Sequence, residues 1–92
     1  MMNCKVEAEV VEILGRGECP FGHRVGDRWT FDGKMPGGIC GSAAYVLFPL
    51  VQTLRFGATP SWSAEEGRAR LCCPDPQNPV VFELRRLEEP LG

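Results

Sequence analysis

The five cysteines are the residues of this 92-residue chain best suited to chemistry. Four of them stand in loops or at the expected ends of helices and strands, where functional residues tend to gather: Cys19, Cys40, Cys72 and Cys73. The fifth, Cys4, opens an apolar–polar alternation. Because thiolates bind soft metal ions and also act as nucleophiles, two chemical interpretations follow.

The first interpretation is a metal centre with Cys19, Cys40, Cys72 and Cys73 as ligands. Sets of thiolates select zinc, Cu(I) or an iron–sulfur cluster. His23 lies four residues after Cys19 and could add an imidazole ligand to zinc. However, the chain has no Cys-x-x-Cys motif, the usual signature of such sites, and the surrounding loop favours a solvated position for His23.

The second interpretation is a thiol enzyme or thiol carrier. Cys40 comes just before an expected helix, whose positive N-terminal end favours a thiolate. Gly37 and Gly38 precede it and would let backbone N–H groups approach an anion. Cys72 is the other candidate nucleophile. The sequence links neither thiol to His23, which is the single histidine.

The third interpretation is a structural or interaction module whose cysteines only fill the core, since free cysteine is among the most buried residue types. Neighbouring residues on a strand point to opposite faces, so we expect Cys73 to face the core and Cys72 to face away. Cys4 is expected in the core as well. The sequence leaves the three interpretations open, and the metal centre is the sharpest of them.

Size and charge narrow the class of protein. A chain of 92 residues is expected to form a single domain over residues 1–92. Its net charge of −2 predicts neither a nucleic-acid partner nor an anionic membrane partner, and no apolar run reaches the ~18 residues of a membrane span. Without a signal-peptide pattern, a cytoplasmic location with reduced thiols is expected. The sequence identifies no small-molecule partner.

The first half of the chain predicts two strands. Cys4, Val6, Ala8 and Val10 alternate with charged residues, the pattern of a half-buried strand. This alternation slips at Val10–Val11, which predicts a bulge. A second strand is expected in the segment "VGDRWTF", residues 25–31. It is expected to place Val25, Trp29 and Phe31 on one face.

A helix is expected from Ser42 to Arg55, where apolar residues recur at helical spacing. Pro49 predicts a kink within it, and Gly57 is placed to end it. Further apolar residues, Val46 among them, lie off the main stripe. We therefore expect a homo-oligomer that covers the surplus apolar face.

Two strands at about Arg68–Cys73 and Val80–Leu87 are expected to form a hairpin. Pairing Ala69 with Leu84 places apolar partners on one face and brings Arg70 opposite Glu83 on the other. Trp62, in the loop before the hairpin, could line a pocket, although pinning that loop is the commoner outcome and is expected here. The prediction is an α+β domain of order β-β-α-β-β, with one kinked helix packed on a small antiparallel sheet.

The order of several short motifs resembles a family of small bacterial and archaeal proteins of about ninety residues. The motifs are Cys19-Pro20 with Phe21, "VGD" before Trp29, Pro36 ahead of Cys40, "LRFG" at 54–57, Trp62, "CCPD" at 72–75 and "PVVFELRRL" at 79–87. The resemblance implies cysteines at the five positions found here and no particular reaction. This chain departs from the pattern where Ser61 separates a proline from Trp62, and His23 matches nothing in it.

Overall fold

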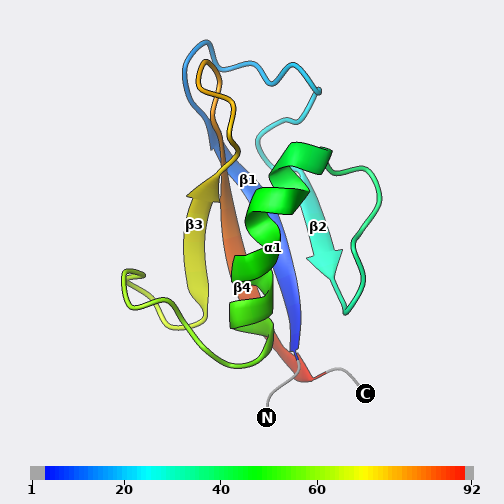
Figure 1. The fold of residues 1–92 in the computed structure, drawn as a ribbon, viewed down its shortest axis with the longest axis vertical. Coiled ribbons are helices and arrows are strands. Elements are labelled where there is room, and N and C mark those ends of the chain that lie inside the picture. The colour runs from blue at the N-terminus through cyan, green and yellow to red at the C-terminus, as the bar shows by residue number, and fades with distance from the viewer. Residues whose placement is uncertain (1–3, 91–92) are drawn as a thin grey trace.

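The computed structural model describes residues 4–90, except for the side chains of residues 88–90. One helix packs on a four-stranded antiparallel sheet (Figure 1). The elements are β1 (Cys4–Ile13), β2 (Arg28–Phe31), α1 (Gly41–Arg55), β3 (Arg68–Cys72) and β4 (Val80–Pro90), and the strands lie in the order β2-β1-β4-β3. The predicted α+β class and the order β-β-α-β-β are confirmed.

The predicted register of the β3–β4 hairpin is confirmed. Ala69 pairs with Leu84 on the face toward the helix, and Arg70 pairs with Glu83 on the other face. A slip of one residue would move each apolar side chain to the opposite face, so the apolar pattern fixes the pairing. β4 also pairs along its length with β1, which places these two longest strands at the centre of the sheet.

The predicted bulge in β1 is confirmed by a register shift between Val10 and Glu12. The predicted second strand is only partly correct. Trp29 and Phe31 lie in β2, but Val25 precedes the strand and its side chain is exposed. A turn intervenes, in which the Arg24 backbone N–H donates to the Asp27 carboxylate and the Asp27 N–H donates back to the Arg24 carbonyl. Because of this turn, β2 begins at Arg28 and not at Val25.

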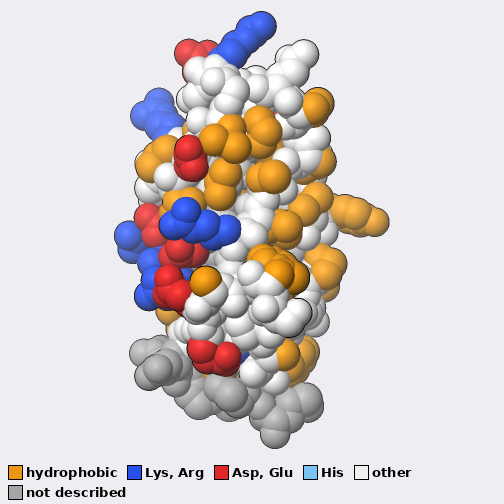
Figure 2. Space-filling view, turned by 90° about the vertical axis from the view of Figure 1, so that its left-hand side faces the viewer, with side chains coloured by type: hydrophobic (Ala, Val, Ile, Leu, Met, Phe, Trp, Pro, Cys, Tyr) orange, Lys and Arg blue, Asp and Glu red, His pale blue; other side chains and the backbone are white. Residues whose placement is uncertain are grey.

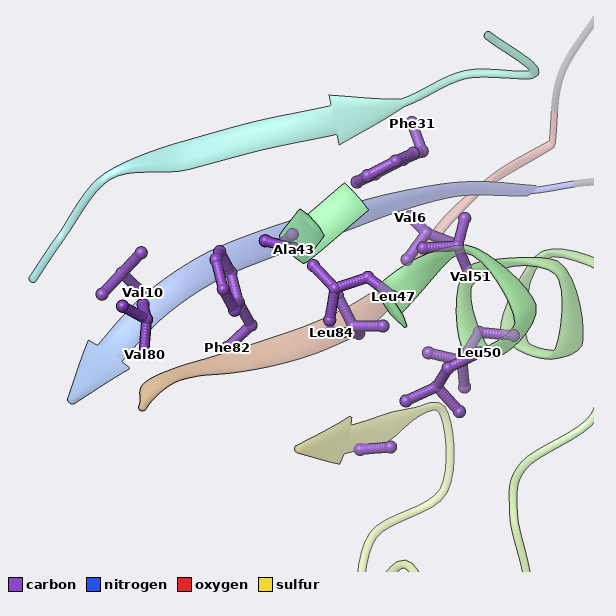
Figure 3. Packing of buried hydrophobic residues seen from close by; sticks show 13 residues of the cluster. Val6, Val10, Phe31, Ala43, Leu47, Leu50, Val51, Val80, Phe82 and Leu84 are labelled. Carbon is purple, nitrogen blue, oxygen red and sulfur yellow. The ribbon is translucent and has the colours of Figure 1, made fainter. Parts of the chain in front are cut away.

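The core lies between α1 and the sheet. Figure 3 shows side chains of the helix and of the two central strands directed into the same space. Its largest fully buried members are Val6, Val10, Phe31, Leu47, Val51, Leu54, Val80, Phe82 and Leu84. Burying one such side chain contributes roughly 1.5–3 kcal/mol. This shared core fixes the helix on the sheet.

Helix α1 runs without a break from Gly41 to Arg55, through Pro49. Gly57 ends it as predicted, because its φ of +95° is a conformation that residues with a Cβ rarely adopt. In the part of the chain that the structure describes, no helix is long and apolar enough to cross a membrane.

The sheet face away from the helix is covered by charged side chains. Arg85 lies at the centre of this face, where its guanidinium contacts the carboxylates of Glu7, at 2.7 Å, and Glu9, and lies 3.8 Å from that of Glu83. Figure 2 shows the segregation, with most charged side chains on one side of the view and hydrophobic side chains over the centre and the other side. The helix side is therefore the apolar side of the molecule.

Candidate functional site

Three of the five cysteines line one pocket at the N-terminal end of α1. Cys19, Cys40 and Cys73 come from three different segments and surround a volume of about 420 Å³. The other lining residues are Pro20, Phe21, Ser42, Pro74 and Asp75. Cys72 lies outside this pocket and is exposed, as predicted for the strand residue that faces away from the core. All five thiols are free.

Cys40 is positioned by the start of the helix. It is the residue before α1, and its carbonyl accepts the N–H of Ala44, the first bond of the helical ladder. Its side chain makes no capping hydrogen bond. Instead, its backbone N–H donates to Nε2 of His23 at 3.0 Å. The Cys40 backbone is thus held by the imidazole at the wall of the pocket that Cys40 lines.

The expectation that His23 is solvated was wrong, because its side chain is 6% exposed. Three aromatic rings surround it, with centroid distances of 4.7 Å to Phe21, 4.8 Å to Trp29 and 6.4 Å to Phe82. Burial lowers the pKa of His23 from its ordinary value of 6.5, while the carboxylate of Asp27 opposes this shift. A neutral imidazole is also what the hydrogen bond requires, since a protonated ring has no acceptor nitrogen.

This geometry gives His23 a structural role at the pocket. Its Nε2 accepts from the Cys40 backbone, so this nitrogen is not available as a base for the Cys40 thiol. The sequence contains one signal of this arrangement, which the prediction of a solvated His23 overlooked: the residue is near the aromatic residues Phe21 and Trp29 in the chain. Aromatic neighbours are favourable for a buried, neutral imidazole.

Cys19 is held by a tight turn. The Gly22 N–H donates to the Cys19 carbonyl at 2.9 Å, which closes a four-residue turn. Pro20 occupies the second position of this turn, where its fixed φ is favourable. The turn brings Cys19 to the pocket wall together with Phe21.

Cys73 sits where the β3–β4 hairpin opens into its loop. Its backbone N–H donates to the carbonyl of Val80 at 3.0 Å, and the Val80 N–H donates to the Cys73 sulfur at 3.3 Å. Cys73 packs partly against the core, as predicted, and also lines the pocket. The backbone contact fixes the position of the sulfur.

The loop after β1 and the β3–β4 loop are locked together, which holds the Cys19 and Cys73 segments in place. Buried Asn78 accepts the backbone N–H of Arg16 at 3.0 Å through its side-chain oxygen. Gly15 adopts a φ of +68°, and a Cβ at this position would collide with the carbonyl oxygen of Gln77. Glycine therefore permits the close approach of the two loops.

The predicted ligand set is only partly brought together. Cys19, Cys40 and Cys73 share the pocket, whereas Cys72 does not. Among the residues that the structure describes, no group of three or more His, Cys, Asp or Glu side chains is placed to hold a metal ion. Cys4 is 1% exposed and belongs to the core, as expected.

Comparison with known proteins adds no assignment: no family model, no curated protein and no solved structure matches the chain. The family resemblance drawn from the order of the motifs therefore stays a prediction. Any proposal for function depends on the pocket itself.

Proposed function

We propose that this protein is a thiol-exchange protein, with Cys40 as its nucleophile and Cys19 or Cys73 as the second thiol. One observation carries the proposal: three free cysteines from three segments line a single pocket at the N-terminal end of α1. The partial positive charge at a helix N-terminus favours a thiolate placed there.

The reaction is exchange with a disulfide. The Cys40 thiolate attacks one sulfur of the incoming compound, its S–S bond breaks, and one half leaves as a thiolate that takes a proton from solvent. Cys19 or Cys73 then attacks the mixed disulfide as a thiolate and releases the other half. Two protein thiols are oxidised to a disulfide, and the substrate disulfide is reduced to two thiols.

The substrate class follows from the pocket wall. Apart from Asp75, the residues around the three thiols are uncharged, and Pro20, Phe21 and Pro74 supply apolar surface. Small-molecule sites of this kind combine an apolar lining with a few reactive or polar groups. We expect a small, neutral, apolar disulfide, and a cytoplasmic location in which the thiols are returned to their reduced state.

The metal-binding function is less well supported than thiol exchange. Cys72 lies outside the pocket, and the described residues hold no ready set of three ligands for a metal ion. Zinc or an iron–sulfur cluster on these cysteines stays a prediction that the same purified sample can test.

The test uses 4,4′-dithiodipyridine, a neutral aromatic disulfide that releases an absorbing thiopyridone. With the Cys72→Ser protein in excess, we expect two thiopyridones per reagent molecule, because a second pocket thiol displaces the first adduct. Adding Cys40→Ser to the Cys72→Ser protein should abolish the fast phase of thiopyridone release. A matched Cys4→Ser variant in the same background should keep it, since Cys4 lies in the core.

Two results would contradict thiol exchange. One is release of a single thiopyridone per reagent with a stable mixed disulfide, which shows that no second thiol is in reach. The other is near-stoichiometric zinc or iron by elemental analysis of the anaerobically purified protein, which would make these cysteines metal ligands.

A further inference from the structure

A shallow apolar groove runs along the flank of α1 that faces β3. Two hollows of about 470 and 450 Å³ share Val46 as a common wall. Together they form what we call the α1–β3 groove, lined by Gly41, Ser42, Tyr45, Val46, Pro49, Leu50, Thr53, Pro60, Ser61, Trp62, Leu71 and Pro74. All these lining residues are uncharged. Such a surface differs sharply from the charged outer face of the sheet.

The groove carries two large aromatic side chains that the rest of the chain leaves uncovered. Tyr45 is 83% exposed on the wall of one hollow, and Trp62 is 63% exposed on the wall of the other. The expectation that Trp62 packs down to pin its loop was therefore wrong, and the alternative, that it lines a pocket, is what the structure has. Exposed aromatic residues beside apolar hollows are typical of the centre of a protein interface.

We propose that the α1–β3 groove is the surface on which a second copy of this chain docks. In a two-fold dimer the same patch meets itself, so a projection and a hollow side by side on one face can fill each other across the axis. Tyr45 supplies the projection, and the hollow around Trp62 and Leu71 receives it. Figure 2, which faces the β3 side, shows hydrophobic side chains spread over this region.

The two exposed aromatic side chains supply about half of the area that a stable dimer needs. A fully buried aromatic side chain covers ~150–250 Å², so Tyr45 and Trp62 at their exposures offer roughly 300 Å² on each copy. Two copies then bury roughly 600 Å² through these residues alone, about half of the ~1,200 Å² at which stable interfaces begin. Exposed groove residues such as Ser42, Pro49 and Pro74 add to this area.

The exposed edge of β3 is a poorer surface for self-association. β3 is an outer strand of the sheet, but Arg68 and Arg70 both project from it with exposed side chains. Both arginines form ion pairs with Glu65 or Glu83 that an approaching edge would have to desolvate, and charged side chains are a common protection of sheet edges. The uncharged groove offers a second copy apolar contact without this desolvation.

The groove is continuous with the thiol pocket, since Ser42 and Pro74 line both. A docked copy therefore covers part of the mouth of the pocket and slows entry of a bulky reagent to Cys40. The dimer itself does not depend on thiol exchange, so either proposal can fail alone.

The test is the molar mass in solution, measured by light scattering after size exclusion at about 20 µM in the presence of a thiol reductant. We expect twice the 10.2 kDa of one chain. Tyr45→Glu and Val46→Arg should each give the mass of one chain, because each places a charge in the contact. Val25→Arg is the matched control, because Val25 is an exposed apolar residue that lines neither hollow of the groove and its variant should stay dimeric.

Circular dichroism shows whether each variant is folded, and Tyr45→Phe provides a milder change that should keep the dimer. A wild-type protein that has the mass of one chain at about 20 µM would overturn the proposal, as would a dimer that survives both charged variants. A monomer that takes up an apolar fluorescent dye, with the dye excluded by Val46→Arg, would overturn it in favour of another occupant of the groove.

Discussion

The two ends of helix α1 are held by opposite kinds of chemistry. At the N-terminal end a neutral imidazole, His23, accepts the Cys40 backbone N–H among aromatic rings. At the C-terminal end the guanidinium of Arg86 donates to the carbonyls of Leu54 and Ala58, both at 3.1 Å, and to Glu66 at 2.7 Å. One end is apolar and carries thiols, whereas the other is built from charges.

This difference assigns a different role to each end: the C-terminal end contributes stability, and the N-terminal end carries the reactive thiols. The C-terminal end follows the ordinary preference of helix C-termini for cations, with Arg86 bonded to backbone carbonyls and to a carboxylate. At the N-terminal end Cys40 occupies the cap position, where Ser, Thr, Asn or Asp is the common choice, and the neutral imidazole of His23 accepts the backbone N–H of Cys40 itself. An aspartate in place of His23 would add a negative charge close to the thiols. The imidazole holds the backbone without doing so.

The largest effect is expected from Gly15→Ala, which disturbs the frame of the N-terminal end. A Cβ at this position requires an unfavourable φ and collides with Gln77, so we expect a loss of more than about 3 kcal/mol in the free energy of unfolding. Gly17→Ala is the matched control. Its φ of +78° is similar but nothing lies within 4 Å, and about 1 kcal/mol is expected. Equal losses in denaturant titrations would contradict the locked loops.

Arg86→Met should have the next largest effect and act at the C-terminal end. It removes the donors to the carbonyls of Leu54 and Ala58, at a cost of about 2 kcal/mol. Arg70→Met is the control, because that side chain is 61% exposed and its ion pair contributes at most about 1 kcal/mol. Thermal and denaturant unfolding measure both. Arg86→Met should leave the reaction rate of Cys40 unchanged, and a slowed rate would show that the two ends are coupled.

His23→Phe should cost about 1–2 kcal/mol, because it keeps an aromatic ring but leaves the Cys40 N–H without its acceptor. Unlike Arg86→Met, this variant should change the rate at which Cys40 reacts with dithiodipyridine. His23→Gln restores an acceptor oxygen and should recover part of the stability. A His23→Phe protein with wild-type stability and wild-type Cys40 reactivity would remove His23 from the site.

The smallest effects are those of pH, and they distinguish the two ends. The pKa of His23 is lowered by burial, so the unfolded chain binds this proton more readily. The stability from neutral His23 is complete above pH 6.5 and is lost as the pH falls below that value. The pKa of Glu66 is lowered from 4.5 by hydrogen bonds from Thr59 and Arg86, so its contribution is lost only below pH 4.5.

Unfolding of the variants at a series of pH values checks this assignment. His23→Phe should lose the fall in stability that begins near pH 6.5 and keep the fall below pH 4.5. Arg86→Met should keep the fall that begins near pH 6.5 and weaken the one below pH 4.5. The same slope near pH 6.5 in the wild type and in His23→Phe would mean that another group titrates there.

The sequence predicted the sheet and helix well because their signals are periodic. The alternation from Cys4 to Val10 and the pairing of Ala69 with Leu84 each depend on which face is apolar, and a wrong register would bury charge. The strand with Val25 was predicted too long, because four residues give little periodic signal and a turn decides where β2 begins.

The site was harder to predict because it consists of loops. Cys19 and Cys73 lie 54 positions apart in the sequence, and only the contacts between their loops bring them together. The bond from Cys40 to His23 joins segments that no periodicity relates, so the buried imidazole was missed. Cys72 was included among the ligands because it adjoins Cys73, although the strand turns the two side chains to opposite faces.

The central claim is that Cys19, Cys40 and Cys73 form one site, and mutual protection tests it most directly. The Cys72→Ser protein is treated with one equivalent of N-phenylmaleimide, and the remaining thiols are then mapped by isotopic alkylation and mass spectrometry. We predict that the first adduct forms on Cys40 and slows the labelling of Cys19 and Cys73 at least tenfold. Labelling of all three at unchanged, independent rates would contradict the shared pocket.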